Sequence, residues 1–195
     1  EQRKKFIDGA MSQGVAKAIA EKLFDFTEPF ARYGFNRSHG AGYALIAYWT
    51  AYFKAHYPDA FMASLLTSEA SKQKVEKLGS IVAEGQRLGL KVLLPDVNAS
   101  ASDFTVETKG QIRYGLSAIK NVGGKAAEAI VAQRSENGRF DSLADLITRL
   151  PQDVVNKKVV ESLACAGALD SLAERNQVLS SIDTILQFAG KKSYL

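Results

Sequence analysis

The chain lacks the features of secreted, membrane-spanning and disulfide-rich proteins. Cys165 is the only cysteine among 195 residues, which excludes a disulfide framework and a cysteine zinc site. Such sparing use of thiols is typical of a reducing cytoplasm. No run of about 18 uncharged apolar residues is present, so no segment is predicted to cross a membrane. We therefore predict a cytoplasmic protein without a membrane partner.

Signatures of catalysis are missing as well. Metal-dependent phosphoryl transfer needs clustered carboxylates, and the sequence has no Asp-x-Asp or similar cluster. Asp141 and Asp145 lie one helical turn apart, but Asp141 is better explained as a helix cap. There is no Gly-rich phosphate loop and no Ser/His/Asp arrangement. We predict no catalytic residue and no metal ligand here, which favours a binding module over an enzyme.

The positive charge of the chain is unevenly distributed. Apolar residues make up 46% and charged residues 24%, as in an ordinary globular protein. Residues 109–158 hold nine Lys or Arg and five Asp or Glu, whereas the remaining sixteen of each cancel. The whole net charge of +4 therefore lies in this segment. Such an asymmetry favours a partner that carries phosphate.

Hydrophobic periodicity predicts a mostly α fold with a small β element of three short strands. The apolar segment 43–57 is predicted to be a helix buried on most sides, after a Gly-rich connection over 30–42. A boundary is expected at 27–29. Further helices are predicted at 1–27 (where Gly9 and Gly14 favour a division into two), 59–68, 72–88, 142–149, 156–165 and 174–188, and strands at 91–94, 104–107 and 111–114.

Residues 116–130 have the spacing of a helix-hairpin-helix. One helix is predicted to end near Ile119 and another to begin near Gly124, with a tight turn between them. Glycine permits close approach of a ligand to the backbone, and a helix N-terminus attracts anions. A DNA phosphate fits this site without any base being read; an ordinary core hairpin is the alternative. The predicted DNA-binding residues are Lys120, Asn121, Val122, Gly123, Gly124 and Lys125.

A second helix-hairpin-helix pattern and a candidate anion site lie elsewhere in the chain. A second, degenerate helix-hairpin-helix is suggested by Val160, Leu163, Gly167, Leu169 and Leu172, and we expect it mainly to pack, because its turn lacks flanking lysines. Before the apolar helix, Ser38 can cap a helix start, which would place Arg37 and His39 at the positive end of its dipole. A triphosphate would suit that site. A capped helix whose Arg and His contact backbone carbonyls is the alternative, and the local sequence favours it.

Residues 33–66, YGFNRSHGAGYALIAYWTAYFKAHYPDAFMASLL, closely resemble the bacterial DNA polymerase III alpha subunits, the C-family of replicative polymerases. The family pattern there is Phe-Asn-Lys-Ser-His, an Ala/Tyr-rich helix and then Lys-Ala-His-Tyr-Pro. The resemblance continues in order through 94–98, 114–123, 156–158 and 166–170 and covers almost the whole chain.

This resemblance implies three parts: the C-terminal part of the fingers domain at 1–70, a connecting helix and small β element at 71–114, and a tandem helix-hairpin-helix at 115–195. It places Arg37 and His39, together with Ser38 and Asn36, beside the triphosphate of the incoming nucleotide. Arg37 replaces the commoner Lys, which keeps the charge but changes the contact geometry.

The resemblance also implies an activity, DNA-directed DNA polymerase (a nucleotidyltransferase) in DNA replication, for a longer parent protein that uses Mg²⁺. Its partners would be primer-template DNA, deoxynucleoside triphosphates, the sliding clamp and other replisome subunits. The palm aspartates of the family would lie upstream, so this chain is predicted to be inactive alone and to bind no Mg²⁺. A stand-alone helix-hairpin-helix protein of repair or recombination and an adaptor for protein partners are the alternatives.

Overall fold

The computed structural model describes residues 1–32, 37–72 and 75–191. These residues form ten α-helices, one 3-10 helix and a three-stranded sheet, which confirms a mostly α fold with a small β element. They divide into two compact units, Glu1–Trp49 and Thr50–Leu195, and each is described by itself. The three-part division into 1–70, 71–114 and 115–195 stays a prediction.

In the first unit, helices α1 (Gln2–Ser12) and α2 (Lys17–Arg32) are separated at Gly14, which adopts a left-handed φ of +83°. The two helices are joined by the rings of Phe6 and Phe24, 5.6 Å apart between centroids, and by the ion pair of Arg3 with Asp25 at 3.1 Å. The expected division near Gly14 is thus confirmed. The expected boundary at 27–29 is wrong, because α2 contains Pro29 and ends only at Arg32. Pro29 has no N–H and therefore cannot donate to the carbonyl of residue 25, and the helix ends soon after it.

Helix α3 (Arg37–His56) is longer and more exposed than its sequence predicts. It includes residues 37–42, which were expected to belong to the Gly-rich connection. None of its residues is buried, and Tyr43 and Trp49 keep 62% and 50% of their surface exposed. The prediction of a buried helix is therefore wrong for this chain. A helix that is apolar all round is buried only where other elements pack on every side of it. Among the described residues, no elements surround α3 in this way.

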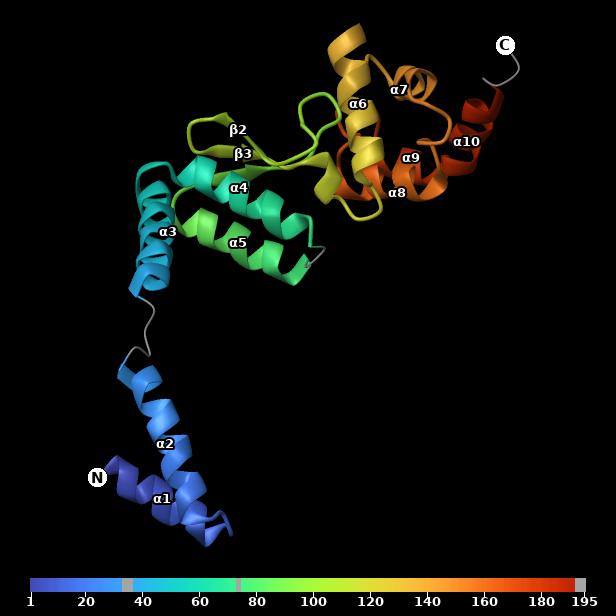
Figure 1. The fold of residues 1–195 in the computed structure, drawn as a ribbon. Coiled ribbons are helices and arrows are strands. Elements are labelled where there is room, and N and C mark those ends of the chain that lie inside the picture. The colour runs from blue at the N-terminus through green and yellow to red at the C-terminus, as the bar shows by residue number, and fades with distance from the viewer. Residues whose placement is uncertain (33–36, 73–74, 192–195) are drawn as a thin grey trace. The chain divides into compact units, whose positions relative to one another are not determined.

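The second unit begins with two helices packed on a small sheet. Figure 1 shows α4 (Pro58–Ala70) and α5 (Val75–Arg87) side by side next to the strands. The strands β1 (Lys91–Leu93), β2 (Thr105–Thr108) and β3 (Gln111–Arg113) lie in the order β1-β3-β2; β1 runs parallel and β2 antiparallel to β3. Met62, Leu66, Phe104 and Ile112 form the core of this part, and the predicted strands are confirmed.

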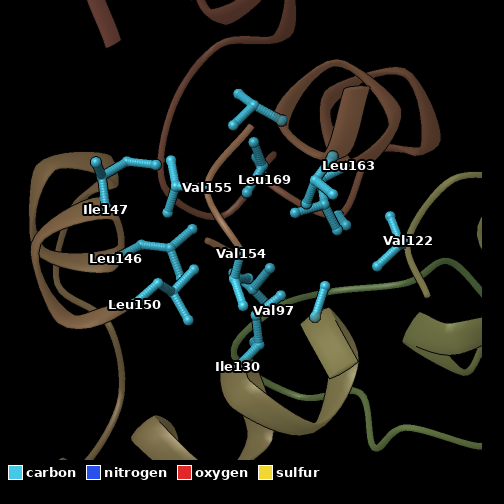
Figure 2. Close-up of a cluster of buried hydrophobic side chains, with 14 of the residues drawn as sticks. Val97, Val122, Ile130, Leu146, Ile147, Leu150, Val154, Val155, Leu163 and Leu169 are labelled. Carbon is cyan, nitrogen blue, oxygen red and sulfur yellow. The ribbon is translucent and has the colours of Figure 1, made fainter. Parts of the chain in front are cut away.

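The rest of the unit is helical and has its own core. Its elements are η1 (Leu116–Ala118), α6 (Gly124–Asn137), α7 (Leu143–Arg149), α8 (Lys157–Ala166), α9 (Arg175–Ser180) and α10 (Ile182–Lys191). Figure 2 shows Val122, Ile130, Leu146 and Leu163 pointing into one cluster of buried side chains. The single helix predicted at 174–188 is instead two helices, which meet at Ser181.

Polar side chains determine where these helices begin and how they attach to the sheet. Ser142 and Asn156 each accept a hydrogen bond from a backbone N–H of the helix that follows. The N-cap of α7 is therefore Ser142, and the prediction of Asp141 as the cap is wrong. Asn98, in the loop after β1, exchanges two hydrogen bonds of 2.9 and 2.8 Å with the backbone of Phe140. Arg134 on α6 donates to the carbonyls of Val97 and Ser100, both at 2.8 Å. The loop after β1 therefore holds α6 in place.

Candidate nucleic-acid interface

The predicted hairpin turn lies at residues 119–124, called turn 1 below. The helix expected to end near Ile119 is only the 3-10 helix η1, and the Val122 N–H donates to the Ile119 carbonyl at 3.0 Å. Asn121 has a φ of +66° and is the one non-glycine residue with positive φ in the described part of the chain. Asn tolerates this conformation better than most residues. Its side-chain amide donates to the Ser162 hydroxyl on α8 at 3.2 Å, which holds the turn against α8.

The two glycines of turn 1 leave the start of α6 open. Gly123 is the N-cap and has an ordinary extended conformation (φ −65°, ψ 167°), without a side-chain cap. A Cβ atom added to Gly123 would meet nothing within 4 Å, so the fold does not require glycine here. Gly124 and Lys125 begin the helix and are exposed. The first N–H groups of a helix have no intrahelical acceptor and are available to an anion at this surface.

The two lysines that flank turn 1 differ in their surroundings. Lys120 is exposed and forms no ion pair with the described residues. Lys125 forms an ion pair with Asp153, whose carboxylate accepts a hydrogen bond from its ammonium. This hydrogen bond and the positive charge lower the pKa of Asp153 from its ordinary value. Asp153 is therefore ionised at neutral pH, and Lys125 has an anionic partner before any DNA binds.

Part of the positive charge at 109–158 stabilises the fold. Arg113 pairs with Glu107 and donates to the Leu94 carbonyl at 2.8 Å. Arg149 donates to the carbonyls of residues 133, 138 and 139 and lies 4.3 Å from the ring centre of Phe140. These arginines, together with Arg134, are engaged inside the unit. The exposed cations of the segment on or after turn 1 are Lys120, Lys125, Arg139, Lys157 and Lys158.

A second turn, residues 150–156 and called turn 2 below, repeats the pattern of turn 1. Residues 122–130 and 155–163 have the same order of buried, half-buried and exposed positions. Gly123 and Asn156 are the N-caps of α6 and α8 in the two copies. Lys158 stands in register with Lys125. The sequence shows this repeat as Val-x-x-Lys followed three residues later by Glu, but a pattern based on glycine does not include it, because Asn occupies the cap.

The second motif predicted from the sequence, at 160–172, lies after turn 2, in α8 and in the segment that follows it. Val160, Leu163 and Leu169 are buried, and Leu172 packs against the same core. Gly167 closes α8 with a left-handed φ of +81°. Its apolar residues therefore contribute to packing.

Arg37, Ser38 and His39 lie together at the start of α3, and all three are exposed. Ser38 is inside the helix, so its predicted role as the cap is wrong: the helix begins one residue earlier. The His39 ring meets the Tyr43 ring edge-on at 4.5 Å. Asn36 lies outside the described residues. Binding of a triphosphate by Arg37, Ser38 and His39 stays a prediction.

Within the described ranges, no three His, Cys, Asp or Glu side chains gather so that they could hold a metal ion. These residues thus do not fit a magnesium site, and no reaction step is assigned to a metal held by them. None of the helices described is long and apolar enough to cross a membrane.

Comparison with known proteins first defines the class of fold. Residues 89–179 match the family model described as "Helix-hairpin-helix motif". This match covers η1, turn 1 and α6 as well as turn 2 and α8, so the helix-hairpin-helix predicted at 116–130 lies inside the matched range.

The relatives then extend the likeness to the rest of the chain. It is 47% identical over 189 residues to the DNA polymerase III subunit alpha of Thermus aquaticus, a match that covers 97% of this chain and 15% of that protein. It is 42% identical over 190 residues to the subunit of the same name from Escherichia coli strain K12, covering 97% and 16%. The chain is therefore related, over almost its whole length, to a segment of the DNA polymerase III alpha subunits, and the resemblance predicted from its motifs is confirmed. It spans about one sixth of the length of these relatives.

Proposed function

We propose that this chain is the part of a replicative DNA polymerase that binds the backbone of duplex DNA through turn 1. The observation that carries the proposal is the open start of α6. Gly123, Gly124 and Lys125 are exposed there, and no side chain caps the helix. The relationship to DNA polymerase III alpha subunits and the helix-hairpin-helix match support the assignment.

The chemistry of turn 1 suits a phosphate and does not suit a base. Backbone N–H groups and the helix dipole favour an anion at the start of α6. Lys120 and Lys125 add two positive charges on either side of the turn. The glycine at position 123 leaves room for a phosphate to approach the backbone closely. Contacts of this kind position a protein on the duplex but carry no sequence information, so binding should be independent of sequence.

A second contact belongs to the same proposal. Arg37, Ser38 and His39 contact the triphosphate of an incoming deoxynucleotide, because they are exposed together at the start of the 20-residue helix α3. A guanidinium can bind phosphate oxygens in a bidentate manner. The hydroxyl supplies a weaker, neutral hydrogen bond, and the imidazole a further one.

The activity of the whole protein follows from the relatives and is also a proposal. The parent would be a DNA-directed DNA polymerase that acts on primer-template DNA and deoxynucleoside triphosphates and works with a sliding clamp and other replisome subunits. Its magnesium ions would be held by residues other than those described here. The isolated chain would bind duplex DNA without extending a primer.

The test of DNA binding is the double variant Lys120→Ala, Lys125→Ala. Each lost phosphate contact should lower the salt slope of binding by about 0.9, and duplexes of different sequence should lose affinity equally. Lys17→Ala, Lys22→Ala removes the same charge from the exposed surface of α2 and should retain the slope. Fluorescence anisotropy at several salt concentrations measures both quantities. An unchanged affinity and slope in the first variant would refute the proposed site.

A further inference from the structure

Turn 2 holds a carboxylate against turn 1. Asp153 lies in a closed turn. The carbonyl of Pro151 accepts hydrogen bonds from the N–H groups of Val154 and Val155 at 3.0 and 3.3 Å, and both valines are buried. The backbone around Asp153 is therefore fixed by a closed turn and by the core. Its side chain remains 58% exposed and reaches Lys125 at the start of α6, whose side chain is 76% exposed. The ion pair thus joins the two copies of the repeat at their solvent-facing side.

We infer that Asp153 competes with DNA phosphate for Lys125 and thereby limits the affinity of turn 1 for duplex DNA. The inference rests on the proposed function, in which Lys125 contacts the backbone. A phosphate that approaches Lys125 meets an ammonium that already has an anionic partner. It must displace Asp153 or share the ammonium with it, and the carboxylate also repels the phosphate. Asp153 is accordingly an affinity-determining residue that need not touch the DNA.

The exposure of the pair determines the size of the effect. Ion pairs between solvent-exposed side chains are weak and are screened by salt, so phosphate can displace Asp153 at a modest cost. The carboxylate therefore weakens binding without preventing it. Such an arrangement suits a surface that must release each phosphate as a duplex advances past it, because sliding along DNA requires sequence-independent contacts that exchange readily.

The competing explanation is that the pair is a clamp. In that case Asp153 and Lys125 hold turns 1 and 2 together, as Asn121 and Ser162 do nearby, and the loss of the pair would loosen the DNA-binding surface. The two explanations predict opposite changes in DNA affinity when Asp153 loses its charge but retains its shape.

The experiment is a double-mutant cycle on the whole 195-residue chain, with Asp153→Asn, Lys125→Ala and the combined variant. The probe is a fluorescently labelled blunt duplex of mixed sequence, titrated at several salt concentrations, and each variant is also melted thermally. Asp25→Asn is the matched control, because Asp25 has the same side-chain exposure of 58% and also pairs with a basic residue, but on α2.

Asp153→Asn should bind the duplex roughly two- to fivefold more tightly at low salt, as expected for release from an exposed ion pair. The gain should shrink as salt rises, and it should largely disappear when Lys125 is Ala. Asp25→Asn should change affinity less. The melting temperature of Asp153→Asn should stay close to that of the unsubstituted chain.

Three results would overturn the inference. Weaker binding with a lower melting temperature would show a clamp. A gain that persists in the Lys125→Ala background would show a general effect of net charge. If the Lys120, Lys125 double variant binds poorly while Asp153→Asn binds like the unsubstituted chain, the inference fails and the proposed function stands. If the Lys120, Lys125 double variant binds normally, both the proposed function and the inference that rests on it are refuted.

Discussion

Substitution of Gly123 by Ala separates a DNA-binding role of turn 1 from a purely structural one. In the structure, the added Cβ would have no neighbour within 4 Å, and the φ of −65° suits any residue. Ala is a poorer N-cap than Gly, which should cost a fraction of a kcal/mol. The smaller conformational freedom of Ala in the unfolded chain should return about 0.4–1 kcal/mol. The free energy of unfolding should therefore change by less than about 1 kcal/mol.

The effect on DNA binding should be much larger. The Cβ would occupy the space through which a phosphate reaches the N–H groups at the start of α6. Loss of one hydrogen bond to a charged group costs about 1.5–3 kcal/mol, which corresponds to roughly ten- to a hundredfold in affinity. Gly79→Ala is the control, because Gly79 lies in α5 and a Cβ there also meets nothing within 4 Å.

The assay combines anisotropy titrations of a labelled duplex with thermal melts of the same preparations. Gly123→Ala should bind weakly and melt normally, and Gly79→Ala should bind normally and melt at the same or a higher temperature, since Ala is the better helix former. Normal DNA binding by Gly123→Ala would refute a close approach of phosphate at this position. A large loss of stability in Gly123→Ala would contradict the finding that a Cβ atom at this position has no close neighbour.

Three further substitutions test the turn, the support of η1 and the nucleotide site. Asn121→Ala should destabilise the protein by about 1–2 kcal/mol, because it loses a side-chain hydrogen bond and strains the left-handed turn, whereas Asn121→Gly should cost less; equal melting temperatures would contradict this account. Gly115→Ala should destabilise by about 1–3 kcal/mol or more, because its Cβ would lie within 2.8 Å of three backbone atoms of residues 102–104, and a normal denaturant midpoint would argue against that packing. In the intact parent polymerase, Arg37→Ala should lower nucleotide incorporation efficiency about ten- to a hundredfold, and His39→Ala somewhat less if its imidazole is neutral. Early melting with normal incorporation per folded molecule would instead assign both residues a structural role.

The parts of the fold that depend on local chemistry could be predicted from the sequence. Ser142 and Asn156 cap helices because their side-chain oxygens accept nearby N–H groups. The three strands follow from short alternating segments between glycines and a proline. Asn121 takes the left-handed position because few other residues can. Each of these features is decided within a few residues of chain.

Features that depend on distant parts of the chain could not be predicted. Trp49 is half exposed although its helix is apolar on all sides. An apolar pattern predicts that a helix needs packing partners, but it does not show whether the chain contains them. The carbonyls held by Arg134 and the carboxylate held by Lys125 come from segments 28 or more residues away. The positive charge of 109–158 therefore predicts a phosphate partner, but the sequence does not show which cations are already engaged within the fold.

The difference between the two caps of the repeat has a kinetic consequence. Asn156 already accepts the Val159 N–H at 3.1 Å, whereas the corresponding end of α6 has no side-chain acceptor. At α6 the Ala126 N–H donates to the Gly123 carbonyl at 3.0 Å, which leaves the Gly124 and Lys125 N–H groups to water until, in the proposed complex, a phosphate replaces it. The backbone needs no rearrangement, so binding requires only the displacement of solvent and the exchange of one exposed ion pair. A surface preorganised in this way avoids the cost of ordering a loop. We therefore expect fast association, with differences among turn 1 variants appearing mainly in the lifetime of the complex.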